Sequence, residues 1–401
     1  MNDGKVRYAA DARRLGAFLL VLAVVAGPLA LWWRGDRAAW DAYPDRKGPY
    51  LSWERSPATS MTISWETPVP GDSVVEYGPS ADLSGATMVA DPENVSLHSV
   101  RLESLTPGAR YYYRVRSSAP AGQEPFQSAV YSFKTAPGAF EPFTFAVLSD
   151  TQAKTIPATS RFDWVVEGIV ANEGDRLAFA LETGDKFEWG DDRPADARRW
   201  FAQVAPLAAR VPVMSAVGNH DRRGGGELFF HYFFLPSEGN DTEAFYSFTY
   251  AECAFIVLDN SRYKPGYLSP DRLAWLENEL REAAATARWT FVAFHVPPFA
   301  SQFDFPYYQA TLAPLLEKYN VTAAFSGHLH FYEHLRVNGV HYFVNGGGGG
   351  DLNGVHVVKP YSKSHELSRQ HHYLRVRVES NRVVVTALSV ANQTLDEVVI
   401  E

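Results

Sequence analysis

The pattern of apolar and polar positions changes twice along the chain and divides it into three regions. Residues 15–33 form an apolar run without a charged side chain. From about Pro49 to Pro137, short segments such as 61–65 alternate between apolar and polar residues with a period of two, which is typical of half-buried strands. Further on, continuous apolar runs such as 143–148 are separated by amphipathic segments. This last pattern predicts strands covered on both faces, with helices between them.

The first region has the properties of an export signal. Its uncharged run is long enough for a membrane span, which takes about 20 apolar residues. Basic residues outnumber acidic ones before it, so the N-terminus is expected to stay in the cytoplasm and the rest of the chain to face outward. We interpret residues 1–34 as a signal-anchor or signal peptide and 35–47 as a polar linker. An uncleaved anchor is favoured over a secreted form, and either places the remainder outside the cytoplasm.

The second region, residues 48–137, predicts an all-β domain. About seven short strands separated by turn signals such as Gly78-Pro79 and Pro107-Gly108 indicate a β-sandwich. The third region, residues 140–401, predicts a layered α/β domain with sheets inside and helices outside. Two helix starts stand out within it, one after Ser160 and one at Ser269-Pro270, because serine caps helices and proline suits their first turn.

Polar residues follow five of the predicted buried strands of the third region. Strand ends in an α/β sheet share one edge, where ligands bind. The five polar blocks are Ser149-Asp150-Thr151-Gln152, Glu182-Thr183-Gly184-Asp185, Gly218-Asn219-His220-Asp221, His295-Val296-Pro297-Pro298 and Ser326-Gly327-His328-Leu329-His330. Their convergence would gather carboxylates, an amide and imidazoles, a set that suits divalent metal ions.

The number of these groups favours two metal ions over one. Seven candidate groups exceed the four ligands of a closed tetrahedral site, whereas a pair of ions sharing one carboxylate would use them all. Such pairs stabilise the attacking and leaving oxygens of a displacement. Each block taken alone is explained as well by a helix cap or a polar turn. Only their ordered occurrence, each after its own apolar strand, favours a metal centre.

Composition narrows the possible functions. The chain of 401 residues is 46% hydrophobic and 21% charged, which is a globular composition, and its net charge is -9. We expect no nucleic-acid binding surface, because phosphate contacts need a basic face. Its one cysteine, Cys253, cannot form an internal disulfide, so the core must be stable without one.

The ordered blocks resemble the motifs of the calcineurin-like metallophosphoesterase superfamily, D-x-H, G-D, G-N-H followed by D or E, H, and G-H-x-H. Residues 295–301 and 327–333 are similar to the H-x-P-x-Y-x-S and G-H-x-H-x-Y-E blocks of its purple acid phosphatase branch. That branch also carries a fibronectin type III-like N-terminal domain, which the second region resembles. The resemblance implies a metallophosphoesterase-like β-sandwich flanked by helices, and it covers about residues 49–350.

The resemblance also implies roles for individual residues and a metal-dependent phosphoester hydrolase. Asp185 would bridge two ions of manganese, iron or zinc, and a metal-bound hydroxide would attack the phosphorus of a phosphomonoester or phosphodiester. His220 would position the substrate or protonate the leaving oxygen, with Asp221 orienting it. The first ion would be held by Asp150 and His330, and the second by Asn219, His295 and His328.

Two departures from the family pattern concern the first metal ion. Gln152 stands where the D-x-H motif has histidine, and Glu188 stands where purple acid phosphatases have tyrosine. No iron–tyrosinate colour is therefore expected. Gln152 offers a neutral oxygen and Glu188 a carboxylate, and both remain candidate ligands. The alternative they leave open is a non-enzymatic envelope binding protein with a decayed metal site.

Two further features of the sequence can each be interpreted in two ways. Arg222-Arg223 would either reach a phosphate group or form a solvated surface pair. The five consecutive glycines at 346–350 would either let the backbone approach the site closely or form a flexible turn.

Overall fold

The computed structural model describes residues 47–153, 160–191, 194–237, 243–262, 264–303, 305–352 and 364–401. Within this part of the chain no helix is long and apolar enough to cross a membrane. The predicted span at 15–33 and its cleavage lie outside the described residues.

The N-terminal domain is built on one sheet whose long β2–β3 hairpin carries the other strands. The first half of β2 pairs with β1 and its second half with β4, while β3 follows it along both halves. We find six strands where the sequence predicted about seven, because β2 and β3 continue through the register shifts near Gly71. The strands are β1 (Lys47–Ser52), β2 (Met61–Gly78), β3 (Thr87–Leu102), β4 (Arg110–Ser117), β5 (Phe126–Gln127) and β6 (Tyr131–Lys134).

This domain is docked on the following one by buried contacts. The Tyr50 hydroxyl donates to the Tyr232 carbonyl oxygen at 2.7 Å, and the Tyr113 hydroxyl donates to that of Ala209 at 2.8 Å. Trp53 is fully buried, with its ring 5.6 Å from that of Phe179. The two parts of the chain therefore share one apolar core.

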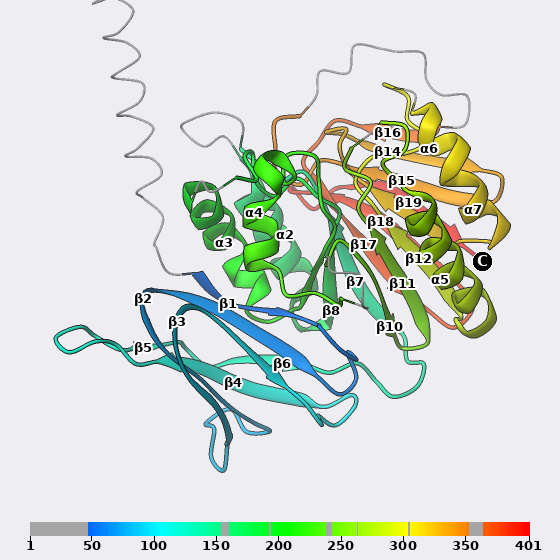
Figure 1. The fold of residues 1–401 in the computed structure, drawn as a ribbon. Coiled ribbons are helices and arrows are strands. Elements are labelled where there is room, and N and C mark those ends of the chain that lie inside the picture. The colour runs from blue at the N-terminus through cyan, green and yellow to red at the C-terminus, as the bar shows by residue number, and fades with distance from the viewer. Residues whose placement is uncertain are drawn as a thin grey trace, which may run out of the picture.

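The larger domain consists of two sheets packed face to face, with helices on both outer sides (Figure 1). One sheet has the order β19-β18-β17-β7-β8-β9 and the other the order β10-β11-β12-β13-β15-β14-β16. The strands of the first sheet are β7 (Phe143–Leu148), β8 (Leu177–Glu182), β9 (Val213–Ser215), β17 (His372–Val378), β18 (Val383–Ser389) and β19 (Thr394–Ile400). Those of the second are β10 (Phe245–Tyr250), β11 (Cys253–Leu258), β12 (Trp289–Ala293), β13 (Ala323–Ser326), β14 (Tyr332–Val337), β15 (Val340–Asn345) and β16 (Ser364–Ser368). This mixed α/β architecture confirms the predicted layers.

Phenylalanines from both sheets fill the space between them. The Phe145 ring of β7 lies 5.1 Å from Phe179, 5.3 Å from Phe255 and 5.4 Å from Phe291. All four are buried, and tilted or offset aromatic pairs of this kind add to the stability that area burial gives. The core thus holds the two sheets in a fixed relation, which matters because both contribute to the site.

The helices cover the two outer faces of the sheets (Figure 1). Ser269 caps α5 by accepting the Arg272 N–H, and Pro270 occupies the first turn, as the sequence predicts. The Ser160 hydroxyl accepts the Phe162 N–H at the start of α2. The helices are α2 (Phe162–Glu173), α3 (Pro194–Ala208), α4 (Glu227–Tyr232), α5 (Pro270–Thr286), α6 (Pro306–Thr311) and α7 (Ala313–Lys318).

Candidate metal centre

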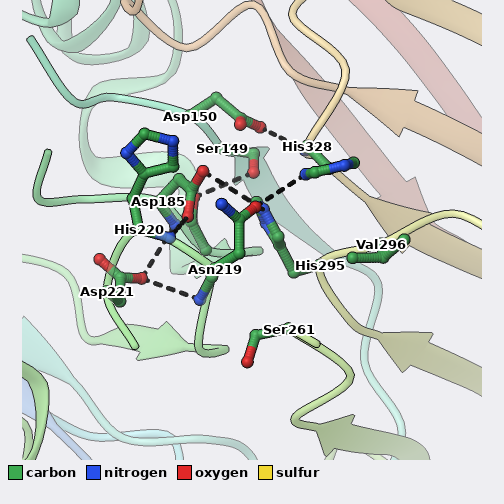
Figure 2. Close-up of polar contacts among 12 residues, drawn as sticks. Ser149, Asp150, Asp185, Asn219, His220, Asp221, Ser261, His295, Val296 and His328 are labelled. Atoms are coloured by element: carbon green, nitrogen blue, oxygen red, sulfur yellow. Dashed lines mark hydrogen bonds and ion pairs between the residues drawn. The ribbon is translucent and has the colours of Figure 1, made fainter. Parts of the chain in front are cut away.

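The predicted metal-binding residues lie at the carboxyl ends of strands from both sheets. Strands β7, β8 and β9 are parallel to one another, as are β11, β12 and β13, so each set directs its strand ends to one edge. Figure 2 shows the side chains that follow these ends turned toward one another. The geometry falls into two groups that share Asp185.

The first group surrounds Asn219. Its Oδ1 atom lies 3.0 Å from His295 Nε2 and 2.8 Å from His328 Nδ1. Asp185 Oδ2 lies 3.3 Å from the same His295 nitrogen. These are the four side chains expected to hold the second ion, and the fold brings them together.

The second group surrounds Asp150. Its Oδ1 atom lies 3.1 Å from His330 Nε2, and the Gln152 amide nitrogen lies 3.3 Å from Asp185 Oδ2 and 3.4 Å from His330 Nε2. The Gln152 Oε1 atom is buried without a hydrogen-bond partner. The oxygen and nitrogen of an amide exchange places when it turns over, so this buried oxygen can face the cluster.

The donor set fits a metal ion. Ligand atoms of Asp150, Asp185 and His295 all lie within 4.8 Å of one another, and all three residues are buried. His295 Nδ1 lies 2.9 Å from the Thr183 carbonyl oxygen, and His330 Nδ1 lies 2.6 Å from that of Asp351. Such outer hydrogen bonds hold the Nδ1 proton, so that Nε2 is the ring atom directed at a metal ion.

The electric field in the cluster also favours a cation. Burial disfavours the charged form of Asp185, but His295 and His220 outweigh it and hold the pKa of that carboxyl well below its usual range. Burial would lower the pKa of His295, yet Asp185 raises it to about 9. At His328, burial and the neighbouring His295 lower the pKa to about 4, so this ring is neutral and able to ligate at neutral pH.

Three of these residues have a strained backbone. The φ angles of Asp150, Asp185 and His328 are 56°, 61° and 70°. A non-glycine residue in the left-handed region costs about 1–3 kcal/mol and is common at functional sites, where the surrounding structure enforces it. The fold therefore holds these three side chains in place at the expense of backbone stability.

The glycine run at 346–350 approaches the site closely. The Gly348 N–H donates to the Ser149 carbonyl oxygen at 3.0 Å, and the Gly350 N–H donates to that of Asp150 at 2.8 Å. A Cβ atom on Gly348 would lie 2.1 Å from the Ser149 oxygen, so no larger residue fits. Of the two interpretations, the structure supports close approach.

Asp221 differs from its predicted role of orienting His220. Its carboxylate instead accepts the backbone N–H groups of Asp185, Lys186, Phe187 and Gly218 at 2.9–3.1 Å. These four hydrogen bonds fix the loop that carries Asp185. The expected contact is replaced because the backbone donors after β8 converge on this carboxylate.

His220 is held by Glu188 and Arg223, which sequence reasoning did not place around it. Its Nδ1 atom lies 3.1 Å from the Glu188 carbonyl oxygen and 3.3 Å from Glu188 Oε2, and Arg223 Nη2 lies 3.2 Å from His220 Nε2. Arg223 also pairs with Glu188 Oε1 at 3.1 Å. The Glu188 carboxylate thus pairs with the Arg223 guanidinium and lies beside the His220 ring, and Arg222 forms a separate ion pair with Asp259 at 3.0 Å. The two arginines are therefore not a solvated pair.

A buried lysine next to Asp185 was also missed. The Lys186 ammonium donates to the Ala216 carbonyl oxygen at 2.8 Å and to Asp221 at 3.2 Å, pairs with Glu182, and is fully buried. Burial raises the pKa of Glu182 to about 8, against the opposing effect of Lys186. No sequence motif predicts this network, because only the packing of the folded chain brings its members together.

The fold and the site together define a class of protein, the two-metal hydrolases that act on phosphoesters. A family model described as purple acid phosphatase, N-terminal domain, matches residues 47–135, and the calcineurin-like phosphoesterase model matches residues 143–332. The chain belongs to the calcineurin-like phosphoesterases and, within them, to the purple acid phosphatase-like branch. It is a hydrolase of phosphoesters that uses a dinuclear metal centre.

Individual relatives agree with this assignment. The chain is 26% identical over 326 residues to acid phosphatase type 7 of Mus musculus, covering 71% of this chain and 70% of the relative. It is 27% identical over 334 residues to purple acid phosphatase 23 of Arabidopsis thaliana, covering 75% and 67%. The Fe(3+)-Zn(2+) purple acid phosphatase 12 of the same plant is 26% identical over 316 residues, covering 71% and 64%.

A solved structure shares the fold. A purple acid phosphatase from yellow lupin (Lupinus luteus) seeds superposes with a TM-score of 0.73 at 18% identity, covering 88% of this chain and 74% of that one. At this identity the match shows the fold alone.

Proposed function

We propose that the phosphoester hydrolase centre of this chain consists of two ion sites bridged by Asp185. Asp150, Gln152 and His330 hold the first ion, and Asn219, His295 and His328 hold the second. The observation that supports this division is the position of Asp185 Oδ2, 3.3 Å from both His295 Nε2 and the Gln152 amide. When bound, two metal ions stabilise the attacking and leaving oxygens of the displacement.

Gln152 replaces the missing histidine in this proposal, and Glu188 is not a ligand. The unpartnered Oε1 atom of Gln152 lies on a fully buried side chain beside the cluster. Glu188 Oε2 is also buried without a hydrogen-bond partner, but the Glu188 carboxylate pairs with Arg223 and lies beside the His220 ring. A carboxylate that is paired with a guanidinium has little reason to leave it for a metal ion.

His220 acts on the substrate from beside the metal ions. A guanidinium only donates hydrogen bonds, so the contact with Arg223 makes His220 Nε2 the acceptor and directs Nδ1–H toward Glu188. Glu188 therefore takes the orienting role that the sequence assigned to Asp221. Arg223, 35% exposed at its side chain, adds a positive charge next to His220 for the phosphoryl oxygens.

The location and the domain division remain part of the proposal. Residues 1–34 anchor the chain in a membrane or are cleaved on export, 35–47 form a linker, and the catalytic domain at 140–401 works outside the cytoplasm. Residues 48–137 form a fibronectin type III-like sandwich that supports it. The β2–β3 hairpin carries β1 on one half and β4 on the other, with register shifts between the halves near Gly71, and this supports two packed layers.

The test uses a protein that begins at Asp41, loaded with manganese, zinc or iron. Hydrolysis of p-nitrophenyl phosphate and of its bis ester is measured together with the metal content per chain. Asp185→Asn should abolish turnover and lower the content below two ions, whereas Asp175→Asn at an exposed position should change neither. A folded protein that binds about one ion per chain and shows no turnover would instead support the non-enzymatic alternative with its decayed metal site.

A further inference from the structure

An apolar pocket opens beside the metal-ligand candidate His328. Its volume is about 550 Å³, and its lining consists of His328, two prolines and four aromatic residues. The aromatic residues are Phe303, Phe305, Tyr307 and Tyr308. Among the lining residues that the structure describes, none is an aspartate, glutamate, lysine or arginine, so these residues present mainly aromatic ring faces to a ligand.

The inner wall of this pocket is fixed to the metal centre. Tyr308 is fully buried, and its hydroxyl donates to the Asn260 carbonyl oxygen at 2.6 Å. The Asn260 side-chain oxygen in turn accepts the backbone N–H groups of His295 and Val296 at 2.9 and 2.8 Å. The loop that carries a metal-ligand candidate and the wall of the pocket therefore share one hydrogen-bonded support, and the pocket is formed in advance of binding.

Two phenylalanines line the path from the pocket mouth to the metal centre. The Phe305 ring is 8% exposed and lies edge-on to His328, with centroids 5.7 Å apart and planes at 67°. Phe303 is 56% exposed, and with the other aromatic lining residues it belongs to one apolar surface, the kind of patch that marks a ligand-binding groove. A flat group entering the pocket would contact Phe303 first and reach His328 last.

The opposite side of the metal centre has a different chemical character. His220 and His328 lie on opposite sides of Asp185 and Asn219 (Figure 2). On the His220 side stand Arg223 and Glu188, and on the His328 side stands the apolar pocket. The site is therefore polar toward the phosphoryl group and apolar toward whatever the phosphoryl group is attached to.

We propose that this pocket binds the ester group of the substrate, and that the ester group is a flat aromatic ring, so that the enzyme prefers aryl phosphoesters. The proposal rests on the phosphoesterase function of the same centre. In the reaction, water adds its oxygen to phosphorus and the bond between phosphorus and the aryl oxygen breaks. Its electron pair stays on that oxygen, which takes up a proton to leave as a phenol.

The experiment measures binding separately from turnover, because aryl esters also react faster for intrinsic reasons. Phenylphosphonate and methylphosphonate, which carry no hydrolysable ester bond, are titrated into the metal-loaded protein by calorimetry. We expect phenylphosphonate to bind about 5- to 10-fold more tightly than methylphosphonate, because aromatic ring contacts typically increase affinity by about this factor. Phe303→Ala should reduce this ratio about 3- to 5-fold, while Met88→Ala, at an exposed apolar position of the N-terminal domain, should leave it unchanged.

The possible outcomes distinguish this proposal from the phosphoesterase function on which it rests. Equal binding of both phosphonates, or an unchanged ratio in Phe303→Ala, overturns the aromatic pocket while hydrolysis of p-nitrophenyl phosphate still supports the phosphoesterase. Tighter binding of octylphosphonate than of phenylphosphonate also overturns it, because it would indicate a lipid chain. If the protein hydrolyses no phosphoester and binds neither phosphonate, the phosphoesterase function itself is contradicted.

Discussion

Replacing Asp221 by asparagine tests how the loop of the bridging residue Asp185 is held. The carboxylate accepts four backbone N–H groups and the Lys186 ammonium. In Asp221→Asn one of its oxygens becomes an NH₂ group, so about two of the N–H groups face a donor and Lys186 loses one counter-charge. Hydrogen bonds to a charged group are worth about 1.5–3 kcal/mol each, and breaking a buried ion pair costs about 3–5 kcal/mol. We expect a loss of about 3–5 kcal/mol in the free energy of unfolding.

The same substitution should weaken metal binding, because outer-shell partners of metal ligands change affinity by about 10- to 100-fold. Urea unfolding gives the stability, and calorimetric titration with manganese gives the affinity. Asp175→Asn serves as the matched control. Should Asp221→Asn keep its stability and metal affinity and lose only kcat, the carboxylate would act through His220 after all, and the role assigned to it here would be refuted.

Three further predictions concern packing, pH and metal removal. Gly218→Ala should reduce metal affinity at least 10-fold in a calorimetric titration, because its Cβ would lie 2.1 Å from Asp185 Oδ1. His98 has its pKa lowered to about 4 by burial, against the opposing effect of Asp72, so its neutral form stabilises the fold above pH 6.5. This contribution should be lost as the pH falls from 6.5 toward 4, with a slope of at most about 1.4 kcal/mol per pH unit, and His98→Gln should reduce the slope in urea unfolding. Chelation should abolish turnover and lower Tm, since ions at 100 times their Kd stabilise by about 2.7 kcal/mol.

Each of these predictions has an opposite result that would count against the structure. Full metal affinity in Gly218→Ala would mean that the Asp185 carboxylate moves freely. Identical pH slopes in His98→Gln and the parent would mean that the ring is not confined between Thr67, Ser73 and Ser117, whose hydroxyls lie 2.8–3.3 Å from its nitrogens. Unchanged Tm after chelation would place the ions outside the folded core.

The arrangement around His220 explains how the site tolerates the loss of the usual tyrosine. Glu188 stands at that position, pairs with Arg223 at 3.1 Å and lies 3.3 Å from His220 Nδ1. The charge it adds near the centre is thereby balanced locally, and the ring of His220 gains an orienting partner. In the function proposed above, this departure is compensated by His220 and Arg223 from the segment after β9 rather than by a new metal ligand.

The sequence by itself determined the order of the strands and the residues that follow them. Apolar runs with polar ends are local features, and a parallel sheet brings such ends to one edge whatever else the chain does. This is why Asp150, Asp185, Asn219, His295 and His328 could all be predicted and are found together. The helix start at Ser269-Pro270 could be predicted for the same reason, because capping depends on neighbours in the chain.

Only the tertiary structure decided which partner each polar group takes. Asp221 lies next to His220 in sequence, yet it bonds backbone groups 34–36 residues away, because a buried carboxylate binds the donors that surround it in space. The glycines at 346–350 and the pocket beside His328 follow the same logic. Their roles depend on which segments, distant in sequence, come into contact in the fold. The local sequence pattern does not predict those contacts.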